Sequence, residues 1–325
     1  MRARLSVALL TAGGDAEIRK TVSCLRAQTI VGELELLIGA PRADDVRLCG
    51  DAVAAFAACR LLSVGDLQRT GDARAALFRA ATGPVVVTAE DHCYPDRDWA
   101  ESLVAAHVGP WTGVGPLVLN ANPLTATSWA DLLLGFGSFL ARPTAVDSGS
   151  APWHNTAYKR EAVMACDAEL PRLLGVEGLL QKELLRRGQR LRLEPRARVY
   201  HLNMSRWASF LAVQHHGARS YAAERARGWN ALRRLTYVSA WPLIAGLRFG
   251  KGLRDARRVR AKRALPRAVP VVLGVGALVA GFGEALGYAF GAGRSAECKG
   301  RLEFGREALL WPGDRKALVG PAGAR

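Results

Sequence analysis

The chain has 325 residues, half of them hydrophobic, which excludes an intrinsically disordered protein and allows a large α/β domain with an appendage. Its formal net charge of +16 indicates polyanionic surroundings, such as nucleic acid, an anionic membrane surface or phosphate-rich ligands. The six cysteines are scattered without a C-x-x-C pair, which favours buried thiols in a reducing compartment over a disulfide framework.

Short apolar runs and amphipathic segments alternate from the N-terminus. Residues 5–10 predict a first strand rather than a signal peptide, because the apolar core is short and no small-residue cleavage site follows. Residues 11–15 predict a turn whose glycines let backbone N–H groups approach a ligand. We expect helices at 18–28 and 53–59 and a strand at 34–39, so the chain begins as βαβα.

The most informative stretch is the valine-rich run 85–89, which is followed at once by Glu90, Asp91 and His92. The run predicts a strand that is buried on both faces of a sheet. Ligands of open α/β sheets bind beyond the carboxyl ends of the strands, and carboxylate and imidazole groups suit Mn²⁺ or Mg²⁺ carrying a phosphate. A polar turn that caps the next helix explains the same residues, so both interpretations stay open.

The alternation of elements continues to about residue 201. We expect further helices and strands as follows: helices at 71–83, 99–107, 129–140, 161–166 and 179–187, and strands at 113–119 and 190–200. This order predicts right-handed crossovers and a Rossmann-like sheet. His201 follows the last strand, where a lone histidine is either a structural hydrogen-bond partner or a ligand.

Several short motifs occur in a characteristic order between residues 5 and 201. They are Gln28-Thr29, Gly71-x-Ala73-Arg74, Ala81-Thr82-Gly83, Asn155-x-Ala157-Tyr158-x-Arg160, Glu177 with Leu180, Leu184 and Gly188, and Pro195-x-Ala197-x-Val199-x-His201. In this order and spacing they resemble the GT-A fold glycosyltransferases of family 2. The form Thr-x-Glu-Asp-His before Pro95 and Trp99 resembles a bacterial subgroup of that family. The resemblance implies an α/β fold of GT-A type, with a Rossmann-like, mixed and mostly parallel sheet sandwiched by helices.

The resemblance also implies a chemistry. GT-A enzymes transfer a sugar from a nucleotide-diphosphate donor, and a divalent metal, Mn²⁺ or Mg²⁺, neutralises the leaving diphosphate. The family's Asp-x-Asp motif corresponds here to Glu90-Asp91-His92, so the implied metal ligands are Asp91, His92 and His201. Imidazole in place of the second carboxylate is expected to alter the metal preference.

Other site residues are carried over from the resemblance in the same way. Glu177 corresponds to the acid that deprotonates the acceptor hydroxyl in inverting members, although a cap of the following helix explains Glu177 too. The implied donor-binding residues are Thr11, Asp15, Arg74, Glu90 and Asp91, and the residues implied at the junction of donor and acceptor are Trp153, His154 and Asn155. The usual nucleotide-contacting Asp after the second strand is replaced by Gly39-Ala40-Pro41-Arg42.

The C-terminal third predicts attachment to a membrane. A basic run at 248–267 carries half of the net charge and directly precedes an apolar stretch at 269–291. Because Glu284 is costly in a bilayer, we expect a re-entrant or interfacial helical hairpin rather than a full crossing, and soluble packing is the alternative. The tail after Leu310 is expected to be loose. The expected division is 1–205 transferase domain, 206–265 helical basic connector, 266–293 membrane-associating segment and 294–325 partly disordered basic tail.

These observations predict an inverting glycosyltransferase at the cytoplasmic face of the membrane. Its expected partners are a nucleotide-sugar donor, a cell-surface or lipid-linked glycan acceptor and an anionic membrane surface. A catalytically degenerate GT-A protein that only binds nucleotide-sugar is the first alternative. A polyanion-binding protein is the second, but nucleic acid is not an expected partner because the sequence has no interleaving of aromatic and basic residues.

Overall fold

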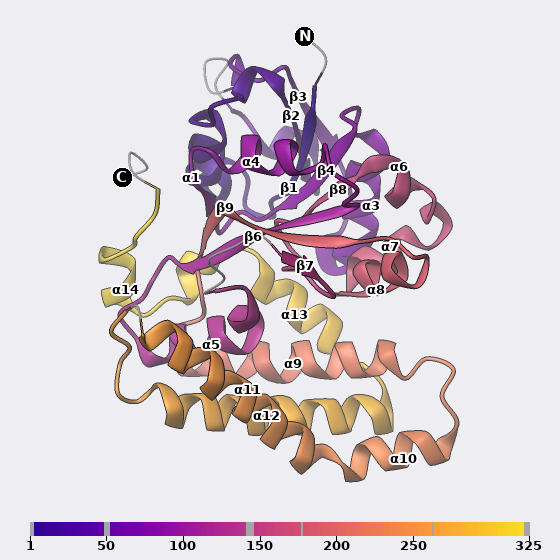
Figure 1. Cartoon of the computed structure of the whole chain (residues 1–325), viewed down its shortest axis with the longest axis vertical. Helices are drawn as coiled ribbons and strands as arrows, with labels where there is room; N and C mark the ends of the chain where they lie inside the picture. The colour runs from indigo at the N-terminus through magenta and orange to yellow at the C-terminus, as the bar shows by residue number, and fades with distance from the viewer. Residues whose placement is uncertain (1–2, 49–52, 141–145, 177, 262, 322–325) are drawn as a thin grey trace. The chain divides into compact units, whose positions relative to one another are not determined.

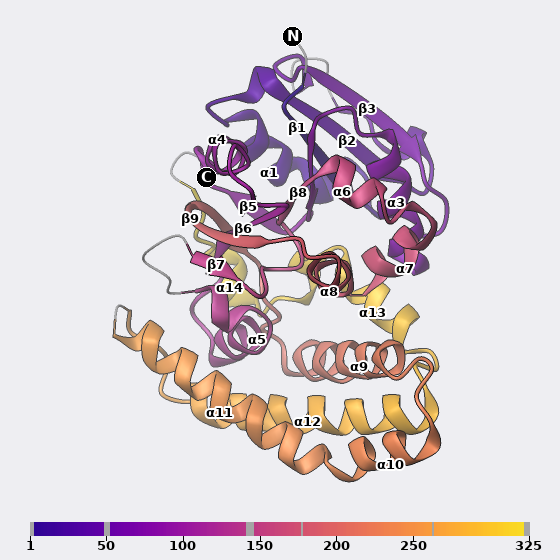
Figure 2. The same ribbon diagram turned by 45° about the vertical axis from the view of Figure 1, so that its right-hand side comes forward.

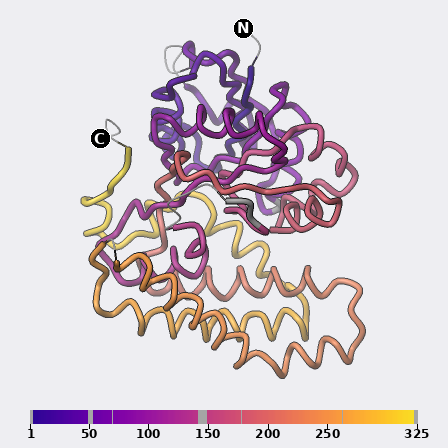
Figure 3. The backbone as a smooth tube through the Cα atoms, viewed as in Figure 1, coloured from indigo at the N-terminus to yellow at the C-terminus, as the bar shows by residue number. Residues whose placement is uncertain are grey.

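The computed structural model describes residues 3–48, 53–140, 146–176, 178–261 and 263–321 (Figure 1). The chain forms two compact units. Unit 1 comprises Met1–Leu119, Arg142–His201 and Gly320–Arg325, and unit 2 comprises Asn120–Ala141 and Leu202–Val319. Unit 2 therefore combines a segment from the middle of the chain with the C-terminal third, as the colours of Figure 3 show.

Within the described residues, unit 1 is built on one nine-stranded sheet, of order β3-β2-β1-β4-β8-β6-β9-β5, with β7 also paired to β9. The strands are β1 (Leu5–Leu10), β2 (Leu34–Ala40), β3 (Ala58–Ser63), β4 (Val85–Ala89), β5 (Cys93–Pro95), β6 (Gly113–Asn120), β7 (Val146–Ser148), β8 (Ala157–Lys159) and β9 (Leu191–His201). The predicted mixed α/β sheet is confirmed.

Among the described strands, parallel pairing joins only four, so the sheet is less parallel than the sequence predicted. Strands β3, β2, β1 and β4 run in parallel, with Val7 opposite both Leu36 and Val87. All residues of β1, β2 and β4 are buried, as expected for apolar runs with helices on both faces. Beyond β4, the pairs of β8 with β4 and β6, and of β9 with β5 and β7, are antiparallel.

Helices of unit 1 pack on both parts of this sheet. They are α1 (Asp15–Arg26), α3 (Thr70–Ala80), α4 (Trp99–Ala106), α6 (Arg160–Met164), α7 (Leu170–Gly175) and α8 (Leu179–Arg186), with 3₁₀ turns at Val31–Glu33, Ala43–Asp45, Leu67–Arg69 and Asp167–Glu169. Helix α3 contacts β1 and β2, whereas α1 contacts β5 and α4 contacts β9. The predicted helix at 53–59 is wrong over most of its length, because residues 54–57 form a turn and a bend and β3 begins at Ala58 and pairs with β2.

Unit 2 is helical. Its helices are α5 (Ala126–Phe136), α9 (Trp207–Arg225), α10 (Ala231–Ser239), α11 (Trp241–Arg260), α12 (Val269–Phe290), α13 (Ser295–Glu303) and α14 (Pro312–Lys316), with 3₁₀ turns at Gly137–Phe139 and Arg306–Leu309. Helix α12 is central, since α5, α9, α10 and α11 all pack against it (Figure 2).

Close packing around α12 explains its many glycines. A Cβ on Gly283 would lie 2.6 Å from the carbonyl oxygen of His215, and one on Gly287 would lie 2.4 Å from that of Arg219, both on α9. Larger residues at these two positions would push α9 and α12 apart. Among the described helices, α12 alone is long and apolar enough to cross a membrane, and just over half of its apolar stretch, 56%, is buried.

Residues 311–321 are held by helix α14 and by hydrogen bonds, contrary to the expected loose tail. Asp314 on α14 is fully buried, and its Oδ2 accepts hydrogen bonds from Asn122 at 3.3 Å and Thr125 at 3.1 Å. The backbone N–H of Val319 donates to the carbonyl of Ala121 at 2.8 Å. One buried carboxylate with polar partners thus fixes a segment whose composition alone suggested disorder.

Candidate functional site

The polar segment after β4 is buried. Glu90, Asp91 and His92 are each no more than 6% exposed. Thr21 on α1 holds this backbone, because its hydroxyl donates to the carbonyl of Asp91 at 2.8 Å and lies 3.3 Å from the carbonyls of Glu90 and Cys93. An exposed polar turn before α4 does not fit this burial. The side chains of Glu90, Asp91 and His92 are therefore shielded from solvent, as in a preformed binding site.

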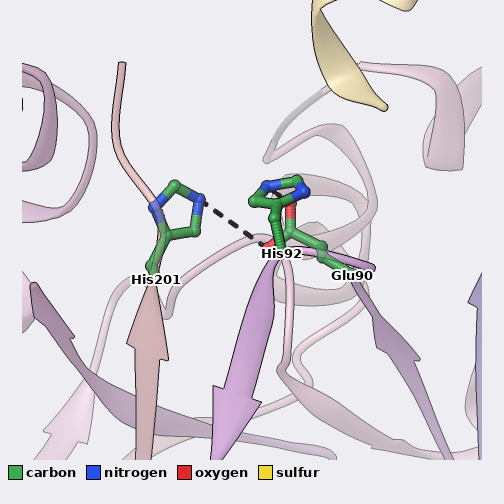
Figure 4. Close-up of side chains that lie close together, drawn as sticks. All are labelled: Glu90, His92 and His201. Carbon is green, nitrogen blue, oxygen red and sulfur yellow. Dashed lines mark ion pairs between the residues drawn. The ribbon is translucent and has the colours of Figure 1, made fainter. Parts of the chain in front are cut away.

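Glu90, His92 and His201 come together at this point (Figure 4). Oε1 of Glu90 lies 3.3 Å from Nε2 of His92, and Oε2 of Glu90 lies 3.9 Å from Nε2 of His201. The centroids of the two imidazole rings are 5.0 Å apart, and the rings are nearly perpendicular. Antiparallel pairing brings His201 here, because it lies directly opposite Cys93 in the β5–β9 ladder.

Asp91 has a different position from the one that the motif implied. Nδ1 of His92 donates to Oδ1 of Asp91 at 2.5 Å, which leaves Nε2 of His92 facing Glu90. Glu90, His92 and His201 each offer a potential ligand atom within 4.8 Å of the others, whereas the motif implied Asp91 with the two histidines. A carboxylate behind a ligating imidazole fixes its orientation and raises its basicity.

The electrostatics of the cluster favour an ionised carboxylate. Burial by itself raises the pKa of Glu90, but the charges of His154, His92 and His201 and a hydrogen bond from His92 hold that pKa well below its ordinary value. One carboxylate surrounded by imidazoles therefore stays charged at neutral pH. A charged carboxylate with two imidazole nitrogens is a donor set that suits Mn²⁺ or Zn²⁺ better than Mg²⁺.

Two of the residues implied at the donor–acceptor junction also contact Glu90. Nδ2 of Asn155 donates to Oε2 of Glu90 at 3.0 Å, and the backbone N–H of Asn155 donates to the carbonyl of Thr88 at 2.8 Å. Asn155 has a φ of +60°, which Asn tolerates better than most residues. Nε2 of His154 lies 3.8 Å from Oε1 of Glu90. The loop that precedes β8 thus closes over the cluster.

A cavity in unit 1 brings two more of the predicted residues together with His154. Arg74, Trp153 and His154 all line it. Arg74 is buried on α3, and its Nη1 donates to the carbonyl of Leu174 on α7 at 3.1 Å. The cavity therefore connects the residue implied on the phosphate side with the loop that covers the cluster.

Glu177, the implied general base, lies outside the described residues. Its neighbours in the chain, Val176 and Gly178, both line the same cavity as Trp153 and His154. Gly178 has a φ of +75° and directly precedes α8.

Thr11 and Asp15 lie where β1 ends, beside the end of β4 in the parallel sheet. The turn amides that were predicted to approach a ligand are bound by a side chain instead. Oε2 of Glu17 accepts from the N–H groups of Gly13 at 2.8 Å and Ala12 at 3.2 Å. Oδ1 of Asp15 accepts from the backbone N–H of Arg47 at 2.7 Å.

Comparison with known proteins gives a structural match. No family model and no curated protein matches the sequence. Among solved structures, the mannosyltransferase PcManGT from Pyrobaculum calidifontis, in complex with GDP-Man and Mn²⁺, is similar over 86% of both chains, with 15% identity and a TM-score of 0.51. The fold is GT-A-like. At this identity the similarity shows a shared glycosyltransferase fold, in agreement with the sheet described above.

Two residues that position the site were missed in the sequence. Thr21 is an ordinary threonine on an amphipathic helix, and nothing in its local pattern indicates three carbonyl contacts. Gln181 on α8 accepts from the N–H of Ala151 at 3.0 Å and donates to the hydroxyl of Tyr158 at 3.0 Å, so it holds the loop beside Trp153. Only the spacing of Gln181 after Glu177 could have drawn attention to it.

Proposed function

We propose that the chain is a metal-dependent glycosyltransferase of family 2, which moves a sugar from a nucleoside-diphosphate sugar to an acceptor hydroxyl. One observation carries the proposal. Glu90, His92 and His201 form a buried cluster at the carboxyl end of β4 in a GT-A-like fold. Ligands of open α/β sheets bind at this end of the strands, which supports a role of the cluster in donor binding.

A divalent cation fits the cluster by the chemistry of its donors. The carboxylate of Glu90 and the Nε2 atoms of His92 and His201 are the proposed ligands, and Asp91 orients His92. When bound, the cation supplies positive charge that stabilises the leaving diphosphate without a proton transfer. Because two of three donors are imidazoles, we expect Mn²⁺ to bind more tightly than Mg²⁺.

Donor and acceptor are assigned to the two sides of this cluster. Thr11 and Asp15 at the end of β1 are proposed on the nucleotide side, and Arg74 is proposed to neutralise phosphate charge. Trp153 and the adjoining loop are proposed to receive the acceptor, because they line the cavity together with Arg74. The proposed acceptor is a cell-surface or lipid-linked glycan of bacterial polysaccharide synthesis.

The proposed reaction inverts the anomeric centre. The acceptor oxygen attacks the anomeric carbon, the bond from that carbon to the diphosphate oxygen breaks, and the electron pair leaves with the nucleoside diphosphate. Glu177 takes the proton of the attacking hydroxyl. Its chain neighbours Val176 and Gly178 line the cavity.

Replacement of this base tests the proposed reaction. Release of nucleoside diphosphate from UDP-, GDP- and dTDP-sugars is measured with Mn²⁺, with a bacterial lipid extract as the acceptor source. We expect Glu177→Gln to lower turnover by about 10²- to 10⁴-fold while nucleotide affinity stays unchanged. Glu183→Gln on α8 is the matched control, since Glu183 pairs with Arg186 and Arg187 on the surface. Full turnover in Glu177→Gln would contradict the assignment.

A further inference from the structure

The outer sides of α10 and α11 carry large apolar residues that the unit does not use for its own packing. Leu232 and Leu235 on α10 are 74% and 62% exposed, and Leu243 and Leu247 on α11 are 65% and 66% exposed. Spacings of three and four residues place each pair on one face of its helix. We call these four leucines the outer leucine stripe.

The opposite faces of the same helices hold the unit together. On α11, Ala245, Gly252 and Ala256 are buried. Ala245 and Gly252 approach Gly281 and Leu273 of α12. Figure 2 shows α10 and α11 lying end to end along one side of α12. The leucines of α11 therefore lie away from α12, whereas α10 buries no residue fully and contacts α12 through half-buried side chains.

Positive charge adjoins the stripe. Residues 231–260 contain a single acidic residue, Asp255, which is buried and paired with Lys251 and Arg258. Arg254 and Arg257 on the last turns of α11 are exposed, as is Arg233 on α10. The exposed side of the two helices thus combines leucine with arginine and presents no exposed carboxylate.

The charge of Glu284 on α12 is neutralised by Arg248 within unit 2. Glu284 is buried, and its carboxylate accepts from Nε of Arg248 at 3.0 Å and from the hydroxyl of Tyr288 at 3.1 Å. Glycines of α12 contact α9 at backbone distance. The membrane element predicted from composition is thus the central helix of unit 2, and just over half of its apolar stretch is buried there.

We propose that unit 2 docks on an anionic lipid surface through the outer leucine stripe, with the exposed arginines of α10 and α11 over the headgroups. Helices that lie in the plane of a bilayer combine an apolar face with lysine and arginine, and each basic residue near an anionic surface adds to the attraction. A nucleic acid would use the arginines but not the leucines. This inference rests on unit 2 alone and does not depend on the proposed transferase activity.

Co-sedimentation of the purified full-length protein with vesicles tests the docking surface. The vesicles are phosphatidylcholine with or without phosphatidylglycerol. We expect strong binding to the anionic vesicles only. Leu243→Gln with Leu247→Gln is expected to weaken that binding at least about tenfold, because two exposed leucines lose their burial in lipid. Arg254→Gln with Arg257→Gln is expected to weaken it roughly twentyfold or more.

Matched double variants separate this surface from general charge and apolarity. Arg26→Gln with Arg97→Gln removes the same charge from exposed positions of unit 1. Val271→Gln with Leu278→Gln removes two exposed apolar residues from α12, where they are 70% and 55% exposed. Both controls are expected to bind anionic vesicles within about threefold of the wild type, and circular dichroism checks that all variants are folded.

Four results would overturn the proposal. The first is equal binding to neutral and anionic vesicles, or none to either. The second is loss of binding in the α12 or unit 1 control with retention in the leucine variant. The third is membrane retention of the protein in cells after an alkaline carbonate wash, which indicates a spanning helix. Binding to a DNA duplex that the leucine variant leaves unchanged, without vesicle binding, would assign the arginines to nucleic acid instead.

Discussion

Thr21 lies on α1, and its hydroxyl contacts the backbone carbonyls of Glu90, Asp91 and Cys93. Its contact with the proposed ligand Glu90 is to the backbone carbonyl and not to the carboxylate. Because it fixes this backbone, Thr21 determines the positions of the Cα atoms from which the side chains of Glu90 and His92 extend. We therefore regard Thr21 as a positioning residue of the cluster formed by Glu90, His92 and His201.

Thr21→Val removes this hydroxyl and keeps the shape of the side chain. Buried carbonyls lose their donor, so the free energy of unfolding is expected to fall by about 1–3 kcal/mol. Mn²⁺ affinity is expected to fall by about tenfold or more, since groups that orient metal ligands typically contribute that much. Calorimetric titration with Mn²⁺ and urea unfolding measure the two effects. Thr21→Ser should restore both, and a Thr21→Val protein with wild-type Mn²⁺ affinity would contradict the positioning role.

His107 predicts a pH dependence of stability in unit 1. Burial, together with the nearby charge of Lys159, lowers the pKa of His107 to about 4 from an ordinary value of 6.5. Below pH 6.5 the unfolded chain takes up a proton that the folded chain does not. The stability that the neutral side chain contributes is therefore complete above pH 6.5 and is lost as the pH falls toward 4.

The expected loss is on the order of 3 kcal/mol across this range, because each unit of pKa corresponds to about 1.4 kcal/mol. Urea unfolding at several pH values between 7 and 4 measures it. His107→Gln has no such titration, so its unfolding free energy should fall less steeply than that of the wild type. Parallel curves for the two proteins would show that His107 is protonated as easily in the folded state as in the unfolded state.

At the scale of elements, α12 is the helix whose composition predicted a membrane segment. It carries Glu284, which forms an ion pair with Arg248 of α11. Glu284 is almost fully buried, and about one third of the Arg248 side chain is exposed. Removing only the arginine leaves a buried carboxylate without its counter-charge. Such a change is costly, whereas removing both charges together is much less so.

Arg248→Met is accordingly expected to lower the free energy of unfolding by about 2–3 kcal/mol, a value reduced for the partial exposure of Arg248. Arg248→Met with Glu284→Gln should recover most of that loss, because the amide oxygen that replaces the carboxylate can still accept from Tyr288. A double-mutant cycle by urea unfolding gives the coupling energy. Additive losses in the double variant would mean that the pair does not stabilise α12 within its unit.

Most elements of unit 1 could be predicted from the sequence, because apolar runs bounded by glycine or polar residues occur in a regular order. The strand β3 could not, since three of its six residues are exposed and its pattern is not that of a buried run. The pairing of β5 with β9 could not either. It joins Cys93 to His201, and an antiparallel contact between such distant residues depends on the whole sheet.

The same limit applies to the candidate site. The position of Glu90, Asp91 and His92 at a strand end was predictable, because the apolar run stops abruptly. The sequence could not predict which of the two carboxylates faces the histidines. Residues 90–92 form an irregular segment, and sequence spacing does not determine the directions of their side chains. The structure places Asp91 against Nδ1 of His92, whereas Glu90 faces both histidines.

At the scale of the whole molecule, the main basic segment and the candidate metal site belong to different units. The acid and imidazole cluster belongs to unit 1, and the basic run 248–267, with half of the net charge of +16, belongs to unit 2. The two proposals are therefore tested separately. Loss of vesicle binding should leave nucleotide binding unchanged, and loss of the metal cluster should leave vesicle binding unchanged.

The central claim is that Glu90, His92 and His201 hold a divalent cation that binds the diphosphate of a nucleotide. Isothermal titration of the protein with UDP, GDP and dTDP, each with and without Mn²⁺, tests it most directly. We predict that one nucleotide binds, that binding requires Mn²⁺, and that His92→Ala abolishes it while His107→Gln does not. Nucleotide binding that is equal without Mn²⁺ and unchanged in His92→Ala, or no binding of any nucleotide under any condition, would contradict the claim.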